Sequence, residues 1–279
     1  MSGGRGARSD PIAVALITFL VLALLFVVAP IAIVVVNSFN SVSYGAWPPP
    51  SFSLRWYANL ADQAEFAGAA VRSIEIGLAA TAASLVTGTL AALALVRLRF
   101  RGKDAVNALL LSPLIVPKIA LGLGGFVLFL RLGVYGSLPS LFLAHWVLTL
   151  PFMVSIVAAG LVRVHPSLEE AAMDLGATRV RAFLEVTVPQ LRRSLTAACV
   201  LSFVVSFDEV DASIFLVAPR APTLPTAMYT YMQKFQDPTL AALSTVLIAG
   251  TLLLAIGVFM FSGPGGVTQL VAAQRTKGE

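Results

Sequence analysis

The chain has 279 residues, of which 58% are hydrophobic and only 12% are charged, and its mean hydropathy is +0.88. Soluble globular domains carry about 25% charged residues, so the composition excludes an ordinary soluble enzyme, and the abundant apolar residues exclude a disordered chain. The single cysteine, Cys199, excludes a disulfide framework. Only two histidines are present, so we expect no metal site, and no group of residues indicates catalysis. The sequence predicts an all-helical integral membrane protein.

Six apolar segments are long enough to cross a bilayer, whose hydrocarbon core requires about 20 predominantly apolar residues per helix. The first is too long for the apolar core of a signal peptide, which has about 7–15 residues, so we expect it to be retained. The third contains two prolines and three glycines, which predict a kinked helix that faces the interior of the bundle. The six segments are Ile12–Val36, Val71–Val96, Ala105–Leu130, Leu138–Val162, Leu195–Val217 and Leu240–Phe261.

The basic residues outside these segments set the expected orientation, because Lys and Arg favour the cytoplasmic side of a membrane. Thirteen of the 19 Lys and Arg fall in one set of loops and termini and four in the other, while Arg72 and Lys118 lie within segments. We therefore expect both termini, and the loop between the fourth and fifth segments, in the cytoplasm. The net charge of +5 is then a topological signal, and no nucleic-acid partner is expected.

The cytoplasmic loop, about residues 163–193, carries clear helix signals. Ser167 followed three residues later by Glu170 indicates a capping box that opens a short helix, and Gly176 suits the left-handed residue that ends it. Thr178 can cap a second helix, which we expect to stop before Pro189. The pattern predicts a helix–Gly turn–helix hairpin outside the bilayer, with apolar residues that its own membrane domain or a partner must cover.

The same loop resembles the EAA loop of bacterial ABC importer permeases. Glu170-Ala171-Ala172 is followed after three residues by Gly176, and after nine more by Val186-Thr187-Val188-Pro189. The family pattern ends in Ile-x-Leu-Pro, so this chain has Val in both apolar places. The resemblance extends over nearly the whole chain, and several stretches are similar to the spermidine/putrescine branch of these permeases. They are Phe52–Tyr57, Ser112-Pro113, Asp174–Ala177, Ser206–Val210 and Leu216–Pro219.

The resemblance implies one ABC-importer transmembrane domain over residues 1–279, with six helices and a multi-pass location in the bacterial inner membrane. The loop would be a coupling hairpin between helices 4 and 5, seated in a cleft of a separate ATP-binding subunit. The implied coupling residues are Glu170, Ala171, Ala172, Gly176 and Pro189.

The implied partners are two ATP-binding subunits, a second permease subunit that is a different chain, an extracytoplasmic solute-binding protein and membrane lipid. The chain has no G-x-x-x-x-G-K-[ST] sequence that could cradle ATP phosphates. ATP and Mg are therefore expected on the partner ATPase, no cofactor is expected on this chain, and the chain by itself is not expected to be an enzyme.

Four charged residues of the third and fifth segments are candidates for the substrate path: Asp208, Glu209, Asp211 and Lys118. Charges inside a membrane are costly and mark functional sites, and Asp208 and Asp211, three residues apart, would share one face of a helix. The acidic residues favour a cationic cargo; alternatively, they lie near the outer interface or pair with Arg220. Lys118 either pairs with Asp208 or Glu209 or meets an anionic cargo. At the position of Lys118, the spermidine/putrescine branch carries an acidic residue, so the lysine here departs from that branch.

These observations together predict the permease subunit of an ATP-driven importer that translocates a small solute, with putrescine or spermidine as the favoured cargo. One alternative keeps the importer and changes the cargo to an opine, an amino-phosphonate or another small organic solute. A second alternative is a self-contained proton-coupled transporter that uses Asp208, Glu209 and His145. The chain shows no internal repeat of the kind that many such transporters carry, and His145 is more simply interpreted as a satisfied packing residue.

Overall fold

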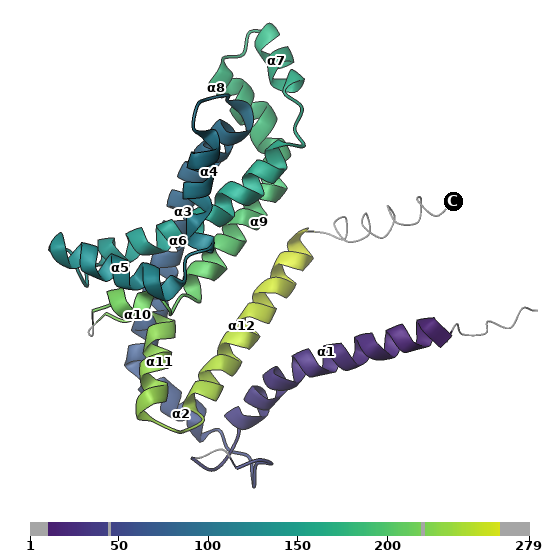
Figure 1. The fold of residues 1–279 in the computed structure, drawn as a ribbon. Helices are drawn as coiled ribbons and strands as arrows, with labels where there is room; N and C mark the ends of the chain where they lie inside the picture. Colours follow the sequence, from purple (N-terminus) through teal and green to yellow (C-terminus); the bar gives the residue numbers. More distant parts are fainter. Residues whose placement is uncertain (1–10, 44–45, 219–220, 263–279) are drawn as a thin grey trace, which may run out of the picture. The chain divides into compact units, whose positions relative to one another are not determined.

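The computed structural model describes residues 11–43, 46–218 and 221–262, and these residues form helices joined by loops (Figure 1). The only β-pairing in this described part is an isolated antiparallel bridge between Asn40 and Phe52, so the predicted all-helical class is confirmed. The elements in chain order are α1 (Pro11–Ser38), α2 (Arg55–Asp62), α3 (Ala64–Arg97), α4 (Lys103–Leu111), η1 (Ser112–Leu114), α5 (Lys118–Arg131), α6 (Leu138–Leu161), α7 (Ser167–Asp174), α8 (Arg179–Ala182), η2 (Phe183–Thr187), α9 (Val188–Phe207), α10 (Ser213–Leu216), α11 (Leu224–Lys234) and α12 (Thr239–Ser262).

Three helices of the described residues, α1, α3 and α6, are long and apolar enough to cross a membrane. The pair formed by α4/η1 and α5 makes a fourth candidate if its two arms are one span, and α12 contributes a shorter apolar helix over Thr239–Leu253. These elements cover the first, second, fourth, third and sixth predicted segments, in that order. The structure thus describes an all-helical membrane protein with three or four candidate spans, while the six-span topology stays a prediction.

The third and fifth predicted segments are interrupted by breaks. The third consists of two helical arms, Lys103–Leu114 and Lys118–Arg131, whose directions differ by 101°. The sequence predicted a kink here, and the structure has a full break at Pro117. Proline has no backbone N–H and disfavours helix in the preceding residue. The prediction of one continuous helix from Leu195 to Val217 is wrong, because α9 ends at Phe207 and α10 begins at Ser213.

The compact unit formed by residues 64–231 is built on the packed helices α3, α6 and α9. Small residues allow these helices to approach closely. A Cβ atom on Gly88 of α3 would lie 2.7 Å from Met153 Cγ of α6, and one on Gly160 of α6 would lie 2.6 Å from Ser194 Oγ of α9. Membrane helices pack through such small residues because lipid provides no hydrophobic drive between them.

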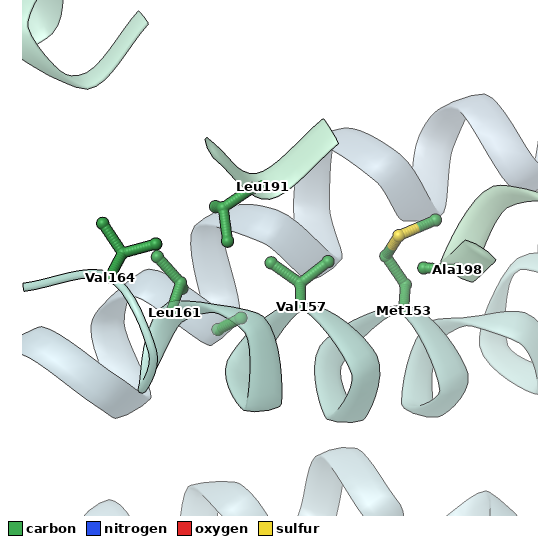
Figure 2. Close-up of a cluster of buried hydrophobic side chains, with 7 residues drawn as sticks. Met153, Val157, Leu161, Val164, Leu191 and Ala198 are labelled. Atoms are coloured by element: carbon green, nitrogen blue, oxygen red, sulfur yellow. The ribbon is translucent and has the colours of Figure 1, made fainter. Parts of the chain in front are cut away.

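A buried apolar cluster fills the contact between these three helices. Figure 2 shows Met153, Val157 and Leu161 projecting from one face of α6, at the four-residue spacing that places side chains one above the other. They meet Leu191 and Ala198 of α9, and Ala92 of α3 completes the contact. The cluster packs α9 against α3 and α6.

A second compact unit comprises residues 1–63 and 232–279, and α2 connects its longer helices. Tyr57 of α2 shares a hydrogen bond of 2.8 Å with Ser38 at the end of α1. Asn59 of α2 donates to Thr239 Oγ1 at the start of α12 over 2.7 Å. These polar contacts fix α2 to one end of α1 and one end of α12. That the whole chain forms a single transmembrane domain stays a prediction.

Candidate functional site

The hairpin between α6 and α9 ends its first helix as the sequence predicts. Gly176 follows α7 with a φ of +95°, a conformation in which a Cβ atom is strained. Its N–H donates to Met173 O over 2.9 Å, and the N–H of Ala177 donates to Ala172 O over 3.0 Å. This pair of bonds is a Schellman motif, which satisfies the last carbonyls of a helix. The predicted role of Gly176 as the left-handed helix terminus is confirmed.

The second helix of the hairpin begins as predicted but does not end where expected. The Thr178 side chain accepts a hydrogen bond from the N–H of Arg181 and caps α8. The expected stop before Pro189 is wrong, because α8 continues through the π-helical turn η2 directly into α9. Proline lacks the N–H that a regular helix would require at this point. The wide turn of η2 lies just before Pro189 and lets the helix proceed past it.

The predicted capping box at Ser167 and Glu170 does not form. Proline has a backbone angle preset for a helix start, and here Pro166 occupies the N-cap position, so Ser167 is the first residue of α7. The Ser167 hydroxyl instead shares a hydrogen bond of 2.7 Å with His165 Nδ1. Glu170 is exposed, and its carboxylate makes no hydrogen bond or ion pair with any residue that the structure describes. It is available to a partner.

The neighbouring Glu169, which the sequence analysis did not single out, holds the hairpin to the helix bundle. The hydroxyl of Thr187 in η2 donates to Glu169 Oε1. The same oxygen lies 3.7 Å from the guanidinium of Arg97 at the end of α3, and Arg97 also donates to Val164 O over 3.1 Å. Sequence spacing offers no signal for this network, because Arg97 and Thr187 approach Glu169 only through the packing of α3 and α9.

The EAA-like residues are otherwise directed outward. Glu170, Ala171, Gly176 and Pro189 are exposed, and Ala172 is half-buried. Apolar side chains beside them are exposed as well: Leu175 is 90% exposed, Val180 is 69% exposed and Leu184 is 56% exposed. An exposed apolar surface beside an unpaired carboxylate is suited to a protein partner. That the EAA-like residues contact an ATP-binding subunit stays a prediction.

The acidic cluster lies in the break between α9 and α10. Asp208 caps the end of α9, and Asp208 and Asp211 are exposed while Glu209 is 1% exposed. Since no helix runs through this stretch, the expected common helical face of Asp208 and Asp211 is not formed. Arg220, an alternative partner for these carboxylates, lies outside the described residues.

Both carboxylate oxygens of Glu209 are engaged within the chain. Oε1 accepts a hydrogen bond of 2.9 Å from the N–H of Ala212 at the start of α10. Oε2 lies 2.8 Å from the ammonium of Lys118, the first residue of α5. The structure thus brings together two of the four residues predicted for the substrate path. The Lys118–Glu209 pair joins the break at Pro117 to the break between α9 and α10.

His145 of α6 spans the same break. Its Nδ1 shares a hydrogen bond of 2.7 Å with Ser206 near the end of α9, and its Nε2 shares one of 2.9 Å with Ser213 at the start of α10. His145 is 2% exposed, so its interpretation as a satisfied packing residue is confirmed. The two serines went unnoticed in the sequence, because their significance depends on the interruption that separates α9 from α10.

A close backbone approach seats α5 against the break. A Cβ atom on Gly122 would lie 2.6 Å from Ala212 Cα and 2.7 Å from Ala212 O. Only glycine permits this distance. Interrupted backbone inside a protein needs groups that satisfy it, and Glu209, His145 and the α5 backbone lie at this interruption.

Comparison with known proteins identifies the family. Residues 75–263 match the family described as the binding-protein-dependent transport system inner membrane component. The chain belongs to this family. It is therefore the inner-membrane, multi-pass permease component of a binding-protein-dependent importer and a non-catalytic transport subunit, and the resemblance seen in the EAA-like loop is confirmed.

Three curated relatives match nearly the full chain. The spermidine/putrescine transport system permease protein PotC of Escherichia coli (strain K12) is 33% identical over 89% of this chain and 90% of its own length. The putrescine transport system permease protein PotI of the same strain is 30% identical over 88% of each chain. The putative 2-aminoethylphosphonate transport system permease protein PhnV of Salmonella paratyphi A (strain ATCC 9150 / SARB42) is 31% identical over 84% of this chain and 88% of its own.

A solved structure has the same fold. It is a bacterial ABC transporter involved in the import of the acidic polysaccharide alginate, and one of its chains matches with a TM-score of 0.70. The match covers 91% of this chain and 97% of that chain at 16% sequence identity. At this identity the likeness concerns the fold alone.

Proposed function

We propose that this chain is the permease subunit through which an ATP-driven importer admits a polyamine, putrescine or spermidine. The observation that carries the cargo assignment is its similarity to PotC and PotI, which extends over nearly nine-tenths of each chain. The acidic residues of the α9–α10 break agree with a cationic cargo, because carboxylates attract ammonium groups and repel anions.

The proposed topology has six membrane segments in one transmembrane domain over residues 1–279, with both termini in the cytoplasm. The excess of Lys and Arg in one set of loops supports this orientation. The fifth segment would consist of α9, the break and α10. The third would consist of the two arms around Pro117. Broken helices of this kind build ion and substrate sites near the middle of the membrane in other transporter folds.

The proposed partners are two ATP-binding subunits, a second permease subunit that is a different chain, an extracytoplasmic binding protein and the surrounding lipid. ATP and Mg would bind to the ATP-binding subunits, and no cofactor to this chain. The hairpin over residues 163–193 would dock on one ATP-binding subunit through Glu170, Ala171, Ala172 and the Gly176 turn, with Pro189 at the return to the membrane. Its exposed apolar residues and the unpaired Glu170 support this assignment.

The proposed substrate path passes the α9–α10 break. Asp208 and Asp211 would contact the ammonium groups of the cargo directly, since both are exposed. Glu209 and Lys118 would form the polar wall behind them, joined by their ion pair. The charge of Lys118 also favours a second candidate cargo, a small amino-phosphonate, because its side chain is 44% exposed and one relative is a putative 2-aminoethylphosphonate permease.

Uptake measurements distinguish these functions. Cells that lack other polyamine importers would be given radiolabelled putrescine, spermidine or 2-aminoethylphosphonate, with and without this chain and its partner subunits. We expect polyamine uptake that requires the chain and is lost when cellular ATP is depleted while the proton gradient is maintained. Uptake of the phosphonate alone would replace the cargo assignment. Polyamine uptake that survives ATP depletion would instead favour a proton-coupled transporter.

A further inference from the structure

The ion pair between Lys118 and Glu209 is strongly asymmetric. The Glu209 side chain is 1% exposed, whereas the Lys118 side chain is 44% exposed. The carboxylate is also fixed by the N–H of Ala212, while Lys118 stands at the first position of α5, on a long flexible stem. The ammonium can therefore leave the pair for solvent, and the carboxylate cannot.

The position of the pair gives this asymmetry a structural consequence. Lys118 follows the 101° bend between α4/η1 and α5, and Glu209 lies in the break between α9 and α10. The helix α5 also touches the α9–α10 break where Gly122 meets the backbone of Ala212. The ion pair thus connects two interrupted helices close to the interruption in each.

Separation of the pair without a substitute is unfavourable. A buried charge that loses its partner is left with its full desolvation penalty, and removal of one member of such a pair destabilises proteins strongly. Replacement of one ammonium by another at the same oxygen avoids that penalty. Putrescine and spermidine carry primary ammonium groups with the same chemistry as the end of a lysine side chain.

We propose that Lys118 is a tethered counter-ion that occupies Glu209 in the empty transporter and that one ammonium group of the cargo displaces. This inference rests on the proposed polyamine function. The exchange keeps Glu209 paired throughout and removes the ionic connection between α5 and the α9–α10 break only when cargo is present. The Lys118–Glu209 ion pair would therefore separate only when cargo occupies the substrate path. Lys118 would also set the affinity for cationic cargo, because every cargo molecule must compete with it for Glu209.

The test uses the assembled transporter in proteoliposomes, with radiolabelled putrescine as the cargo. Lys118→Met removes the competing charge and keeps the apolar stem, so we expect the KM for putrescine to fall at least fivefold. Lys118→Arg keeps the charge and is the matched control, for which we expect a KM close to that of the unsubstituted chain. In the Glu209→Gln background, Lys118→Met should leave the KM unchanged, because there is no carboxylate left to compete for.

An exchanged pair separates this role from a structural one. Lys118→Glu combined with Glu209→Lys retains an ion pair but removes the oxygen that accepts from the N–H of Ala212. The Tm of the assembled complex is therefore measured with it, to show that the α9–α10 break is intact. The proposal predicts that assembly is retained and that putrescine uptake falls at least tenfold, because the buried group is then a cation that repels the cargo.

Two results would overturn the exchange alone: an unaltered KM in Lys118→Met, or normal uptake by the exchanged pair. Absence of putrescine and spermidine uptake by the unsubstituted transporter would instead refute the proposed function, and the exchange with it.

Discussion

Two substitutions of Gly176 can distinguish two effects: backbone strain within the hairpin, and steric exclusion from the groove of a partner subunit. The residue has a φ of +95°, and no atom lies within 4 Å of the position that a Cβ would occupy. A left-handed conformation costs an L-residue about 1–2 kcal/mol, which corresponds to roughly a 5–30-fold change in an equilibrium. Gly176→Ala and Gly176→Leu share this backbone cost, and in both the Cβ atom points into open space.

The two variants should therefore differ only through a partner. We expect Gly176→Ala to weaken hairpin docking by about that factor and to retain part of the ATP-dependent uptake. Gly176→Leu should abolish uptake, because the larger side chain would have to enter the groove of the ATP-binding subunit. Both should insert into the membrane in normal amounts, which immunodetection in membrane fractions would measure, and copurification would report how much ATP-binding subunit each variant retains.

Gly102 offers a matched control for this pair. It has a φ of +81° and open space at its Cβ position, but it precedes α4 and is not part of the hairpin. Gly102→Ala and Gly102→Leu should therefore give equal uptake. If Gly176→Leu transported as well as Gly176→Ala, no tight groove would surround the turn, and the assignment of Gly176 to coupling would be refuted.

Substitutions at three further positions, Leu191, His145 and Glu169, test the packing and polar contacts around α9. Leu191→Ala removes a side chain that is 1% exposed and should cost about 2–5 kcal/mol of stability, measured as a lower Tm of the purified complex. Val200, on the same helix, is 58% exposed, so Val200→Ala should leave the Tm almost unchanged. His145→Phe would leave two buried serine hydroxyls without their partner, at about 1–3 kcal/mol each, and a Tm equal to that of the unsubstituted complex would contradict the bridging role. Glu169→Ala should loosen the hairpin and so raise the number of ATP molecules hydrolysed per cargo molecule. Glu169→Gln retains an acceptor for Thr187 and should raise this ratio less. If the unsubstituted transporter and both variants had the same ratio, Glu169 would have no role in coupling.

The sequence predicted the elements whose signals are local. Composition and segment length identified α1, α3 and α6, since a helix that crosses a bilayer must be apolar along its length. Gly176 and Thr178 were assigned correctly because a left-handed glycine and a capping threonine act on backbone groups only one to three residues away. The EAA-like spacing identified the family for the same reason, being contained in one loop.

What the sequence could not provide depends on contacts between distant residues. The apolar stretch from Leu195 to Val217 has no proline to mark its interruption, and the break after Phe207 is stabilised by His145 and by the buried carboxylate of Glu209. Glu169 was overlooked beside Glu170 because its partner Arg97 is far away in the sequence. The capping box was misplaced because Ser167 fits that pattern as well as any serine would, while Pro166 decides where the helix starts.

The helix α9 connects the hairpin mechanically to the α9–α10 break. Its 20 residues extend about 30 Å, from η2 and the Glu169 network at one end to Glu209 and the His145 contacts at the other. Between these ends, the apolar cluster with α3 and α6 leaves little freedom for bending, because close-packed side chains transmit displacement. A movement of the hairpin would therefore reach the ion pair as a shift of the whole helix. In the proposed exchange, release of Lys118 by a cargo ammonium would remove resistance to that shift. The buried Glu209 carboxylate would then make ATP-driven movement depend on cargo, which the hairpin alone cannot do.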